Sequence, residues 1–443
     1  MKAALLAALY RAAGAAAVAS LRLAAQLAAA GDEESRRLRW GERLGRWRGG
    51  IPSGAWVWVH AASVGEARIA AALVEALEAA LGGQPRPTFV VTCQTPTGRR
   101  TARAAGARIV HYFPIDAVAV MRPILTSGRL LLYVSIETEL WPVLLAELGR
   151  AGIASAIANA RISHASLGRY RRVRELFAPG LAGLAAVCAR DAVSAERLVW
   201  LGVPEAVVSV TGDIKFDLAS GGETTRKPLL PVDPTRPLLV AASTHAGEEE
   251  VALDAFARLR RQRPHLRLAL APRHPERSTH ATAAAAALGL RVTRLSEFEQ
   301  RQRCAGAEAG CAWDVLVVDS VGRLREALAG AAAAFVGGSL VRGPGGHNLL
   351  EIVGAHLRVI TGPYLDNVAE QVQMLEEADA ITIVRDAGAL ASAWAADLAD
   401  PQSAAAAAAR AGAALAVRRG ALAATVAILA PLIRARSAAE ASR

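Results

Sequence analysis

The chain has 443 residues, 53% of them hydrophobic and 21% charged, so it is a globular protein long enough for two ordinary domains. Its 51 Lys and Arg against 40 Asp and Glu give a net charge of +11, which indicates an anionic partner: a phosphate-bearing ligand, a nucleic acid or an acidic lipid. The spacing of Cys93, Cys188, Cys304 and Cys311 fits neither a redox CxxC pair nor a zinc knuckle, and we expect reduced thiols in a cytoplasmic protein.

The first thirty residues are apolar, but Arg11 and Arg22 leave no uninterrupted apolar run of about 18 residues. The spacing of these two arginines is close to three helical turns, so they lie nearly in line and leave a wide Ala, Leu and Val face. We predict a helix that anchors the protein in a membrane interface, with a secretory signal peptide and an ordinary packed helix as alternatives. A basic cluster that would attract anionic lipid head groups follows: Arg36, Arg37, Arg39, Arg43, Arg46 and Arg48.

From residue 56 onward, short β-type runs alternate with longer Ala- and Leu-rich helical stretches. In the first half, we predict strands at 56–61, 88–93, 129–137 and 153–160, with helices near 67–81, after Pro96 and through Leu148. In the second half, we predict strands at 237–244, 267–273, 291–295, 314–320, 332–338 and 358–362, with helices near 247–263 and through Leu288.

This alternation predicts an α/β protein with two doubly wound, Rossmann-like domains, each a parallel sheet with helices on both faces. A Gly-, Pro- and Thr-rich segment marks the linker between them. The expected organisation is an N-terminal helix at 1–30, a domain at 31–217, the linker at 218–237, a second domain at 238–402 and a helical tail at 403–443. Ligands are expected in a central cleft that the two domains face, at the carboxyl ends of the strands.

The stretch "HAASVGE", residues 60–66, passes from a strand into a helix. Ser63 and Glu66 have the S-x-x-E spacing of a capping box, in which both side chains satisfy free backbone amides. Alternatively, Glu66 acts as a general base, because a helix N-terminus favours the ionised carboxylate. We expect Ser63 to cap the helix and Glu66 to turn away from the backbone.

The segment "CQTPTG" places Thr95, Thr97 and Gly98 after a strand, with Pro96 in position to open a helix. These residues could receive an anion or form a simple N-cap.

Glu137 and Glu139 emerge directly from an apolar strand, where a carboxylate is unfavourable unless it is paired or near solvent. We predict a functional role for at least one of them. Arg161, which also follows a strand, could pair with such a carboxylate or with a phosphate.

The second half has polar residues at corresponding places. Lys215 precedes the linker and could reach a cleft, although a solvated lysine is the alternative. Ser243 and Thr244 end a strand where we expect a helix to start, and Arg273 and His274 follow another apolar strand. An arginine at that position is suited to grip a phosphate or carboxylate.

The longest polar signal is "FVGGSLVRGPGGHNLLE", residues 335–351. Its glycines allow close approach to a ligand, and Asn348 and Glu351 would lie on the first turn of the next helix. The segment has neither the Walker pattern nor GxGxxG, so a purine NTPase or dinucleotide dehydrogenase is not supported. It fits a nucleotide or nucleotide-sugar site, with Glu351 on ribose hydroxyls.

Taken in order, "HAASVGE", "TPTG", "ETELWP", "NARIS", "TGDIKFD", "STHAGEE", "PRHPER" and "FVGGSLV…GGHNLLE" resemble the 3-deoxy-D-manno-octulosonic acid (Kdo) transferases of lipopolysaccharide assembly. The resemblance implies a GT-B fold with an N-terminal acceptor domain and a C-terminal CMP-Kdo domain. It also implies work at the cytoplasmic face of the cell inner membrane, without a metal or cofactor. The expected reaction transfers Kdo from CMP-Kdo to a lipid A precursor, lipid IVA, with inversion at the anomeric carbon.

By motif, Glu66 matches the general base of that family, and Glu137 and Lys215 match residues that stabilise the transition state. The positions expected to bind CMP-Kdo are Pro272, Arg273, His274, Val321, Gly322, Arg323, Gly337, Gly338, Ser339, Gly346, Asn348, Leu349, Leu350 and Glu351. The acceptor-side candidates are Ser63, Thr95, Thr97, Gly98 and Arg161.

The chain departs from the family pattern at Arg323, where an acidic residue is usual, at Leu349, where proline is usual, and at Ala246, where glutamate is usual. A backbone contact to the donor would survive the change at Arg323. The alternatives are another GT-B enzyme that uses a UDP-sugar, a catalytically dead membrane scaffold, or a nucleic-acid-binding protein. The last is disfavoured, because aromatic content is 5% and the arginines are not interleaved with aromatic residues.

Overall fold

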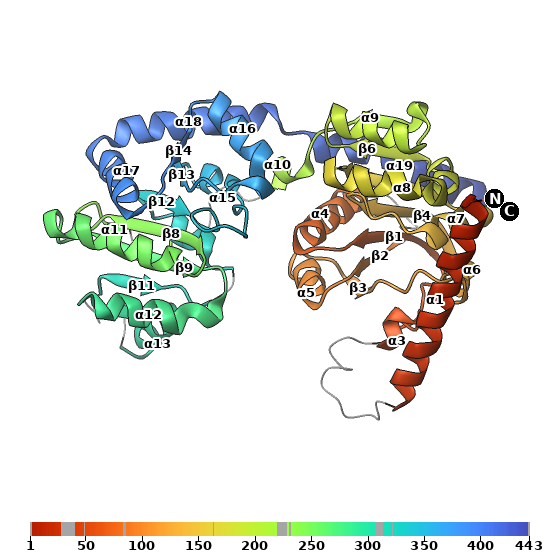
Figure 1. Cartoon of the computed structure of the whole chain (residues 1–443), viewed down its shortest axis with the longest axis horizontal. Coiled ribbons are helices and arrows are strands. Elements are labelled where there is room, and N and C mark those ends of the chain that lie inside the picture. The colour runs from red at the N-terminus through yellow and green to blue at the C-terminus, as the bar shows by residue number, and fades with distance from the viewer. Residues whose placement is uncertain are drawn as a thin grey trace. The chain divides into compact units, whose positions relative to one another are not determined.

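The computed structural model describes residues 2–27, 40–47, 49–82, 86–162, 164–218, 228–229, 232–305, 313–320 and 322–441. The chain divides into two compact units, each built on one parallel sheet (Figure 1). Unit 1 is Met1–Leu218 with Arg418–Arg443, and unit 2 is Ala219–Val417. The predicted α/β class, with two parallel sheets, is confirmed.

The sheet of unit 1 has seven parallel strands in the order β3-β2-β1-β4-β5-β6-β7. They are β1 (Ala55–Ala61), β2 (Thr88–Cys93), β3 (Ile109–Tyr112), β4 (Arg129–Ile136), β5 (Ala154–Ala160), β6 (Ala186–Ala189) and β7 (Val208–Val210). Strand order reverses between β1 and β4. The carboxyl ends of these two strands therefore form the switch point at which doubly wound sheets bind ligands.

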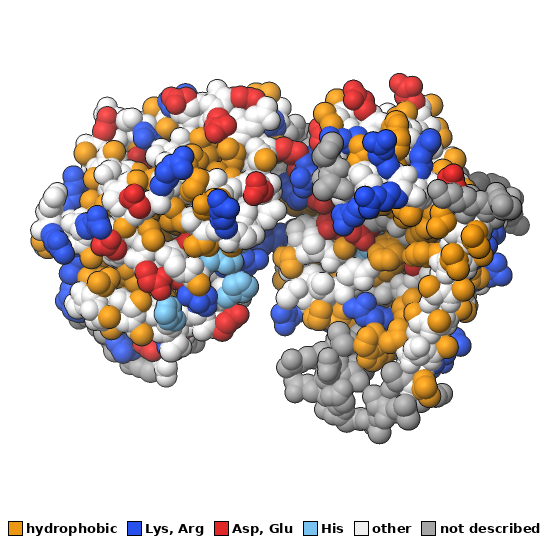
Figure 2. All heavy atoms as spheres, viewed as in Figure 1, with side chains coloured by type: hydrophobic (Ala, Val, Ile, Leu, Met, Phe, Trp, Pro, Cys, Tyr) orange, Lys and Arg blue, Asp and Glu red, His pale blue; other side chains and the backbone are white. Residues whose placement is uncertain are grey.

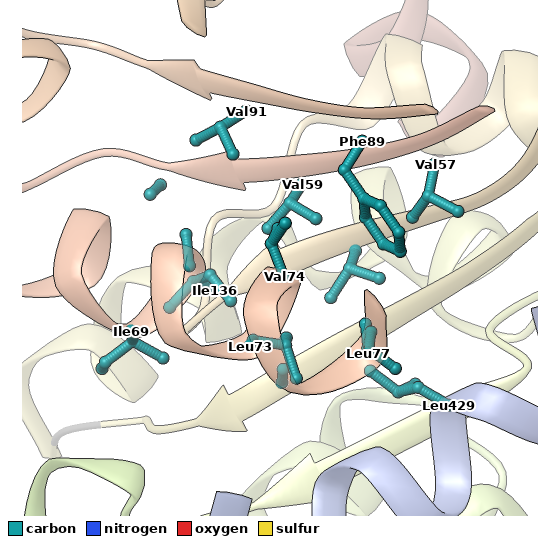
Figure 3. Close-up of a cluster of buried hydrophobic side chains, with 14 of the residues drawn as sticks. Val57, Val59, Ile69, Leu73, Val74, Leu77, Phe89, Val91, Ile136 and Leu429 are labelled. Atoms are coloured by element: carbon teal, nitrogen blue, oxygen red, sulfur yellow. The ribbon is translucent and has the colours of Figure 1, made fainter. Parts of the chain in front are cut away.

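Helices cover both faces of this sheet. They are α1 (Lys2–Leu27), α3 (Trp40–Arg43), α4 (Val64–Leu81), α5 (Pro96–Ala104), α6 (Val118–Thr126), α7 (Pro142–Arg150), α8 (His164–Leu181), α9 (Ala192–Leu201), the 3₁₀ turn η1 (Glu205–Val207), α10 (Ile214–Leu218) and α19 (Ala421–Ala441). Trp56 and Trp58 of β1 point into one core, while Val57 and Val59 point into the other. The second core includes Leu429 of α19, so the C-terminal helix packs against unit 1 (Figure 3).

The sheet of unit 2 also has seven parallel strands, in the order β10-β11-β9-β8-β12-β13-β14. They are β8 (Leu238–Thr244), β9 (Arg267–Pro272), β10 (Val292–Arg294), β11 (Val315–Val317), β12 (Ala333–Val336), β13 (Val359–Thr361) and β14 (Ile381–Ile383). Here the order reverses between β8 and β12, which places the switch point beside the glycine-rich segment.

The helical elements of unit 2 are α11 (Glu248–Gln262), η2 (Pro275–Arg277), α12 (Ser278–Ala287), α13 (Leu295–Ala305), α14 (Leu324–Leu328), α15 (Leu350–Gly354), η3 (Asp366–Val368), α16 (Ala369–Glu377), α17 (Ala387–Ala399) and α18 (Pro401–Val417). The predicted helical tail is divided at its middle, because α18 belongs to unit 2 and α19 to unit 1. Asp217 at the end of α10 accepts hydrogen bonds from the amides of Gly420 and Leu422 and so fixes the start of α19.

Helix α1 packs on unit 1 along one narrow stripe. Val18 is buried, the Tyr10 hydroxyl donates to Asp116 at 3.0 Å, and a side chain at Gly14 would lie 3.3 Å from the Asp116 carbonyl oxygen. Most of the helix is exposed, including Leu5 and Leu9, and hydrophobic side chains run along it in Figure 2. Within the described residues, two stretches are long and apolar enough to span a membrane by length and composition: Leu5–Leu23 and Pro401–Ala438.

The basic cluster predicted after α1 is only partly open to ligands. Arg43 is half-buried, donates to the Gln94 carbonyl oxygen at 2.6 Å and lies 4.8 Å over the Tyr112 ring. Its proposed role toward lipid head groups is therefore wrong, because the guanidinium is used inside the fold. Arg46 is exposed. The other four arginines, Arg36, Arg37, Arg39 and Arg48, and most of the linker lie outside the described residues.

All ten predicted strands are present, and the thiols of Cys93 and Cys188 are free and buried, as expected. The side chains of Cys304 and Cys311 lie outside the described set. Four strands were not predicted: β3, β6, β7 and β14. They are three or four residues long, as are the predicted strands β10, β11, β12 and β13, so length alone does not explain why they were missed.

Candidate functional site

Three carboxylates and one ammonium gather at the switch point of unit 1. Glu66 follows β1, Glu137 and Glu139 follow β4, and Lys215 lies in α10. The charges of Glu66, Glu137 and Lys215 influence one another electrostatically. The structure therefore brings together the three residues that the sequence assigned to catalysis.

Glu66 is 7% exposed and lies in the first turn of α4. Its Oε2 accepts the backbone N–H of Ala62 at 2.7 Å, and its own N–H donates to Ser63 Oγ at 3.2 Å. The expectation that Glu66 turns away from the backbone is wrong. Its carboxylate accepts the N–H of Ala62, whereas a standard capping box would use the N–H of the N-cap residue, Ser63. The physical reason is that free amides at a buried helix start require acceptors. A carboxylate has about four acceptor positions, so these bonds leave capacity for a substrate hydroxyl.

Glu137 and Lys215 form an ion pair, with Nζ 2.6 Å from Oε1. Glu137 has a φ of 56°, a left-handed conformation that is rare outside glycine, and its N–H donates to the Ala158 carbonyl oxygen. This turn directs the chain out of β4, and holding it costs about 1–3 kcal/mol, as is common at functional sites.

A buried network holds Lys215 in place. Asn159 is fully buried, also has a positive φ of 55°, and donates from its side-chain nitrogen to Asp213 Oδ1 at 3.0 Å. Its side-chain oxygen accepts the N–H of Ile214, and Asp213 accepts the N–H of Lys215 at 2.9 Å. Arg190, which follows β6, also pairs with Asp213. Asn159 of β5 and Arg190 therefore hold the start of α10 together.

Burial and neighbouring carboxylates raise the pKa values of Glu139 and Glu66. Burial raises the pKa of Glu139 to about 7, and the charges of Glu66 and Glu137 add to this effect. Burial also raises the pKa of Glu66, against hydrogen bonds from Ala62 and Ser63; Glu137 raises it further, while Lys215 lowers it. His60, 4.0 Å from Glu139, is neutral at pH 7 because burial lowers its pKa to about 3. A carboxylate whose pKa rises toward neutrality is a better proton acceptor.

The remaining acceptor-side candidates are mainly structural. Thr95 Oγ1 accepts the N–H of Gly98 at 3.0 Å, so this threonine is the N-cap of α5, the simpler of the two alternatives. Thr97 Oγ1 lies 3.2 Å from Thr95 Oγ1. The Arg161 backbone N–H donates to Thr138, and its guanidinium forms no ion pair with a carboxylate among the described residues. Of the two alternatives for Arg161, the carboxylate pair is not formed, since Lys215 pairs with Glu137, and the phosphate alternative stays a prediction.

In unit 2, the switch point is organised by a residue that the sequence reasoning missed. Glu248, the first residue of α11, is fully buried. Its carboxylate accepts four backbone N–H groups, from His245 at 2.8 Å, Gly338 at 2.6 Å, Ser339 at 2.8 Å and Leu340 at 2.7 Å. One side chain thus joins the end of β8 to the glycine-rich segment. The signal in the sequence was three consecutive glutamates at a helix start.

The glycines are required by close approach. A side chain at Gly337 would lie 2.6 Å from Glu248 Oε2, and one at Gly338, where φ is 70°, would lie 2.6 Å from the His347 ring. The Gly346 N–H donates to the Gly338 carbonyl oxygen at 2.7 Å, which closes the loop on itself. The loop is therefore a rigid support and not a flexible tether.

Three histidines and an arginine line the same end of the sheet. His245 Nε2 lies 2.7 Å from His347 Nε2, and the His274 ring packs edge-on to His245. Burial, with the neighbouring His245, Arg273 and His274, lowers the pKa of His347 to about 4, so the histidine pair is neutral at pH 7. Arg273 is exposed and, among the described residues, has no carboxylate partner. Its guanidinium is therefore available to pair with an anion.

Several predicted donor positions could contact a ligand only through the backbone. The Leu349 and Leu350 side chains are fully buried. The Ser339 hydroxyl donates to the Val336 carbonyl oxygen and accepts the Gly362 amide. The Arg323 guanidinium pairs with Glu299 and Glu326, so a side-chain contact from it to the donor is disfavoured.

Asn348 is exposed, Glu351 lies in the first turn of α15, and Pro272 ends β9. Gly322 precedes α14 with a φ of 89°, and Val321 lies outside the described residues.

No group of three or more His, Cys, Asp or Glu within the described part of the chain is arranged to hold a metal ion.

The comparison with known proteins agrees with this geometry. Residues 38–218 match the family model of 3-deoxy-D-manno-octulosonic-acid transferase. A 3-deoxy-D-manno-octulosonic acid transferase from Haemophilus influenzae is 33% identical over 78% of this chain and 79% of its own length. The chain belongs to the Kdo transferase family. A Bordetella pertussis member with the same name is 34% identical over 72% of this chain and 74% of its own length.

As a Kdo transferase family member, the protein is a glycosyltransferase of lipopolysaccharide synthesis. Its fold is GT-B. A solved UDP-N-acetylglucosamine 2-epimerase superposes with a TM-score of 0.51 at 11% identity, covering 81% of this chain and 91% of its own, which supports the fold alone.

Proposed function

We propose that this Kdo transferase moves Kdo from CMP-Kdo to a lipid A precursor, lipid IVA, with inversion and with Glu66 as general base. The observation that carries the proposal is the convergence of Glu66, Glu137 and Lys215 at the switch point of unit 1, with the pKa of Glu66 raised.

In the proposed step, a sugar hydroxyl of the acceptor gives its proton to Glu66 while its oxygen bonds to the anomeric carbon of Kdo. The bond from that carbon to the CMP phosphate oxygen breaks, and CMP leaves with the electron pair. Attack from the face opposite the leaving group inverts the anomeric carbon. The Ala62 amide holds the carboxylate still during the transfer.

The Lys215–Glu137 pair supports this step electrostatically. Negative charge moves from the base to the leaving phosphate, and a fixed ammonium stabilises such charge more than mobile water does. Lys215 also keeps Glu66 ionised by lowering its pKa, which opposes the effects of burial and of Glu137.

Unit 2 is the proposed donor-binding part. Arg273 would bind the phosphate or the sugar carboxylate of CMP-Kdo, and the loop of Gly337 and Gly338 would approach the nucleotide closely. Asn348 and Glu351, at the start of α15, would contact the ribose. The other predicted positions would act through their backbone groups.

We further propose that the protein works on the cytoplasmic side of the cell inner membrane, with α1 in or on the bilayer. The support is an exposed apolar helix that packs on unit 1 along a stripe that includes Tyr10, Gly14 and Val18. A lipid acceptor would be delivered from the same membrane.

A direct assay tests the donor and the acceptor. Full-length protein is offered CMP-Kdo or UDP-sugars together with a defined lipid A precursor, and products are weighed by mass spectrometry. We expect a product heavier by Kdo from CMP-Kdo alone. A product from a UDP-sugar alone would contradict the proposal and favour the other GT-B enzyme, and no product with either would favour an inactive scaffold.

A further inference from the structure

A groove of about 270 Å³ lies between α1, α7 and α8 of unit 1, on residues that the transfer chemistry does not use. Most of its wall is hydrocarbon. The apolar residues that line it include Ala7, Val118, Val143, Ala146, Leu176 and Pro179. The volume corresponds to about nine groups the size of a water molecule, which suits part of a ligand and not a whole nucleotide.

Three polar side chains of the wall, Tyr10, Glu147 and Arg150, already have partners within the protein. The Tyr10 hydroxyl donates to Asp116, and Glu147 accepts from both Arg122 and Arg150. The charged residues that line the groove balance one another: Arg11, Arg150, Glu147 and Glu175. A ligand in the groove would therefore gain mainly from burial of apolar surface, and neither an anion nor a cation is favoured.

The shape of α8 keeps the groove open. The helix loses helical geometry at Val173 and contains Pro179, so its last turns follow a different direction. At Gly180 its backbone closely approaches α7, where an added side chain would lie 2.6 Å from Leu145 Cβ. Gly180 also lines the groove, so this close contact forms part of its wall.

The groove connects two parts of unit 1 that the proposed function uses. One wall is α1, the exposed apolar helix; the other is α7, which begins three residues after Glu139. Asp116 joins them, because it accepts the Tyr10 hydroxyl and also the amides of Val143 and Leu144 at the start of α7. Nine residues of helix span about 13 Å, so the groove runs from the neighbourhood of the carboxylates toward the far end of α7.

We propose that this groove binds one fatty acyl chain of the acceptor lipid and so sets the acceptor specificity of the enzyme. The proposal rests on the proposed function, in which the acceptor is an acylated, phosphorylated glucosamine disaccharide. Continuity with the apolar face of α1 gives the chain a path from the bilayer, and the start of α7 leads to the carboxylates that act on the sugar.

The test fills the groove and compares two acceptors. Ala7→Phe and Ala146→Phe place a ring in it, whereas Ala8→Phe adds the same ring to an exposed position next to Ala7 on α1. Full-length variants are assayed with CMP-Kdo and either the acylated precursor or the same phosphorylated disaccharide without acyl chains. We expect the two groove variants to raise KM for the acylated acceptor at least ten-fold. The KM values for the deacylated acceptor and for CMP-Kdo should change less than two-fold, as should all values for Ala8→Phe.

Each other outcome overturns the proposal. Equal losses with both acceptors would mean that the substitutions act on the fold, and unchanged KM values would mean that no acyl chain enters. If the groove variants only weaken binding to phospholipid vesicles without acceptor, the groove holds a bilayer lipid instead. The unsubstituted enzyme separates this proposal from the proposed function: if it fails to transfer Kdo to either acceptor, the proposed function itself is wrong.

Discussion

The carboxyl ends of β1 and β4 in unit 1 carry three carboxylates, one of them paired with Lys215 of α10, whereas the corresponding end of the sheet in unit 2 carries a glycine loop, an arginine and the histidine pair. The two sheets have related strand orders and the same switch point. What differs is the chemistry that the loops place there.

Glu66 and Glu248 occupy equivalent positions in the two units but differ in their hydrogen-bond partners. Each follows a glycine and lies in the first turn of the helix after the first strand of its sheet. Glu248 accepts four backbone amides and is fully buried, so its lone pairs are used by the protein. Glu66 accepts one backbone amide, and burial together with the charge of Glu137 raises its pKa. Equivalent positions thus hold a structural anion in one unit and the proposed proton acceptor in the other.

The largest expected effect comes from removing the proton acceptor. Glu66→Gln keeps the size of the side chain and can still accept from Ala62, but it cannot take a proton, so kcat should fall by about 10²–10⁴. CMP affinity, measured by calorimetry, should not change. Glu75→Gln, at an exposed position of the same helix, is the control. Near-normal turnover in Glu66→Gln would remove the base assignment.

Removal of the cation in unit 1 should have the next largest effect. Lys215→Met should lower kcat by about 10²–10³, a range typical for loss of one electrostatic stabiliser. Because Lys215 lowers the pKa of Glu66, the acidic limb of kcat/KM against pH should also move to higher pH. The full pH profile measures both effects. A fall in kcat with an unmoved limb would mean that Lys215 does not act on the base.

In unit 2, the corresponding change should affect donor binding more than chemistry. Glu248→Gln replaces one acceptor oxygen with an NH₂ group that faces amide donors, and an unsatisfied buried group costs about 1–3 kcal/mol. We expect KM for CMP-Kdo to rise about ten- to hundred-fold with a smaller change in kcat. Glu250→Gln, two residues further along α11 at an exposed position, is the matched control. Equal KM values for both variants would contradict the role of Glu248 in supporting the loop.

The smallest effect concerns stability. The pKa of Glu139 is about 7 in the folded protein against 4.5 for a free glutamate, so the folded state binds the additional proton between these values. Stability therefore falls as pH rises from 4.5 through 7. Glu139→Gln stays neutral, so it should exceed the parent by about 1–3 kcal/mol at pH 8 and equal it at pH 4, as thermal unfolding at the two pH values would show. A constant difference would contradict the raised pKa.

Much of the fold could be predicted from local patterns. Strands such as "TFVVTC" and "RLALAPR" are short apolar runs between helical stretches, and burial on both faces of a parallel sheet requires such runs. The short strands β3, β6, β7 and β14 were not predicted; β3, β7 and β14 lie at sheet edges, and three or four residues are too few to show a periodic pattern. Asn159 and Glu248 were missed as supports because each contacts a residue far away in the chain, Asp213 at 54 residues and Gly338 at 90 residues.

The sequence by itself determined the α/β class, the order of motifs and the residue types available for proton and anion chemistry. Only the tertiary structure decided that Glu66 keeps unused acceptor positions while the carboxylate of Glu248 is saturated with backbone hydrogen bonds. It also showed that Lys215 and not Arg161 pairs with Glu137, and that Glu66 is both a helix cap and a base candidate. The physical reason is that the pKa and the hydrogen-bond partners of a side chain depend on what surrounds it. Those surroundings come from strands and helices that are distant in the chain.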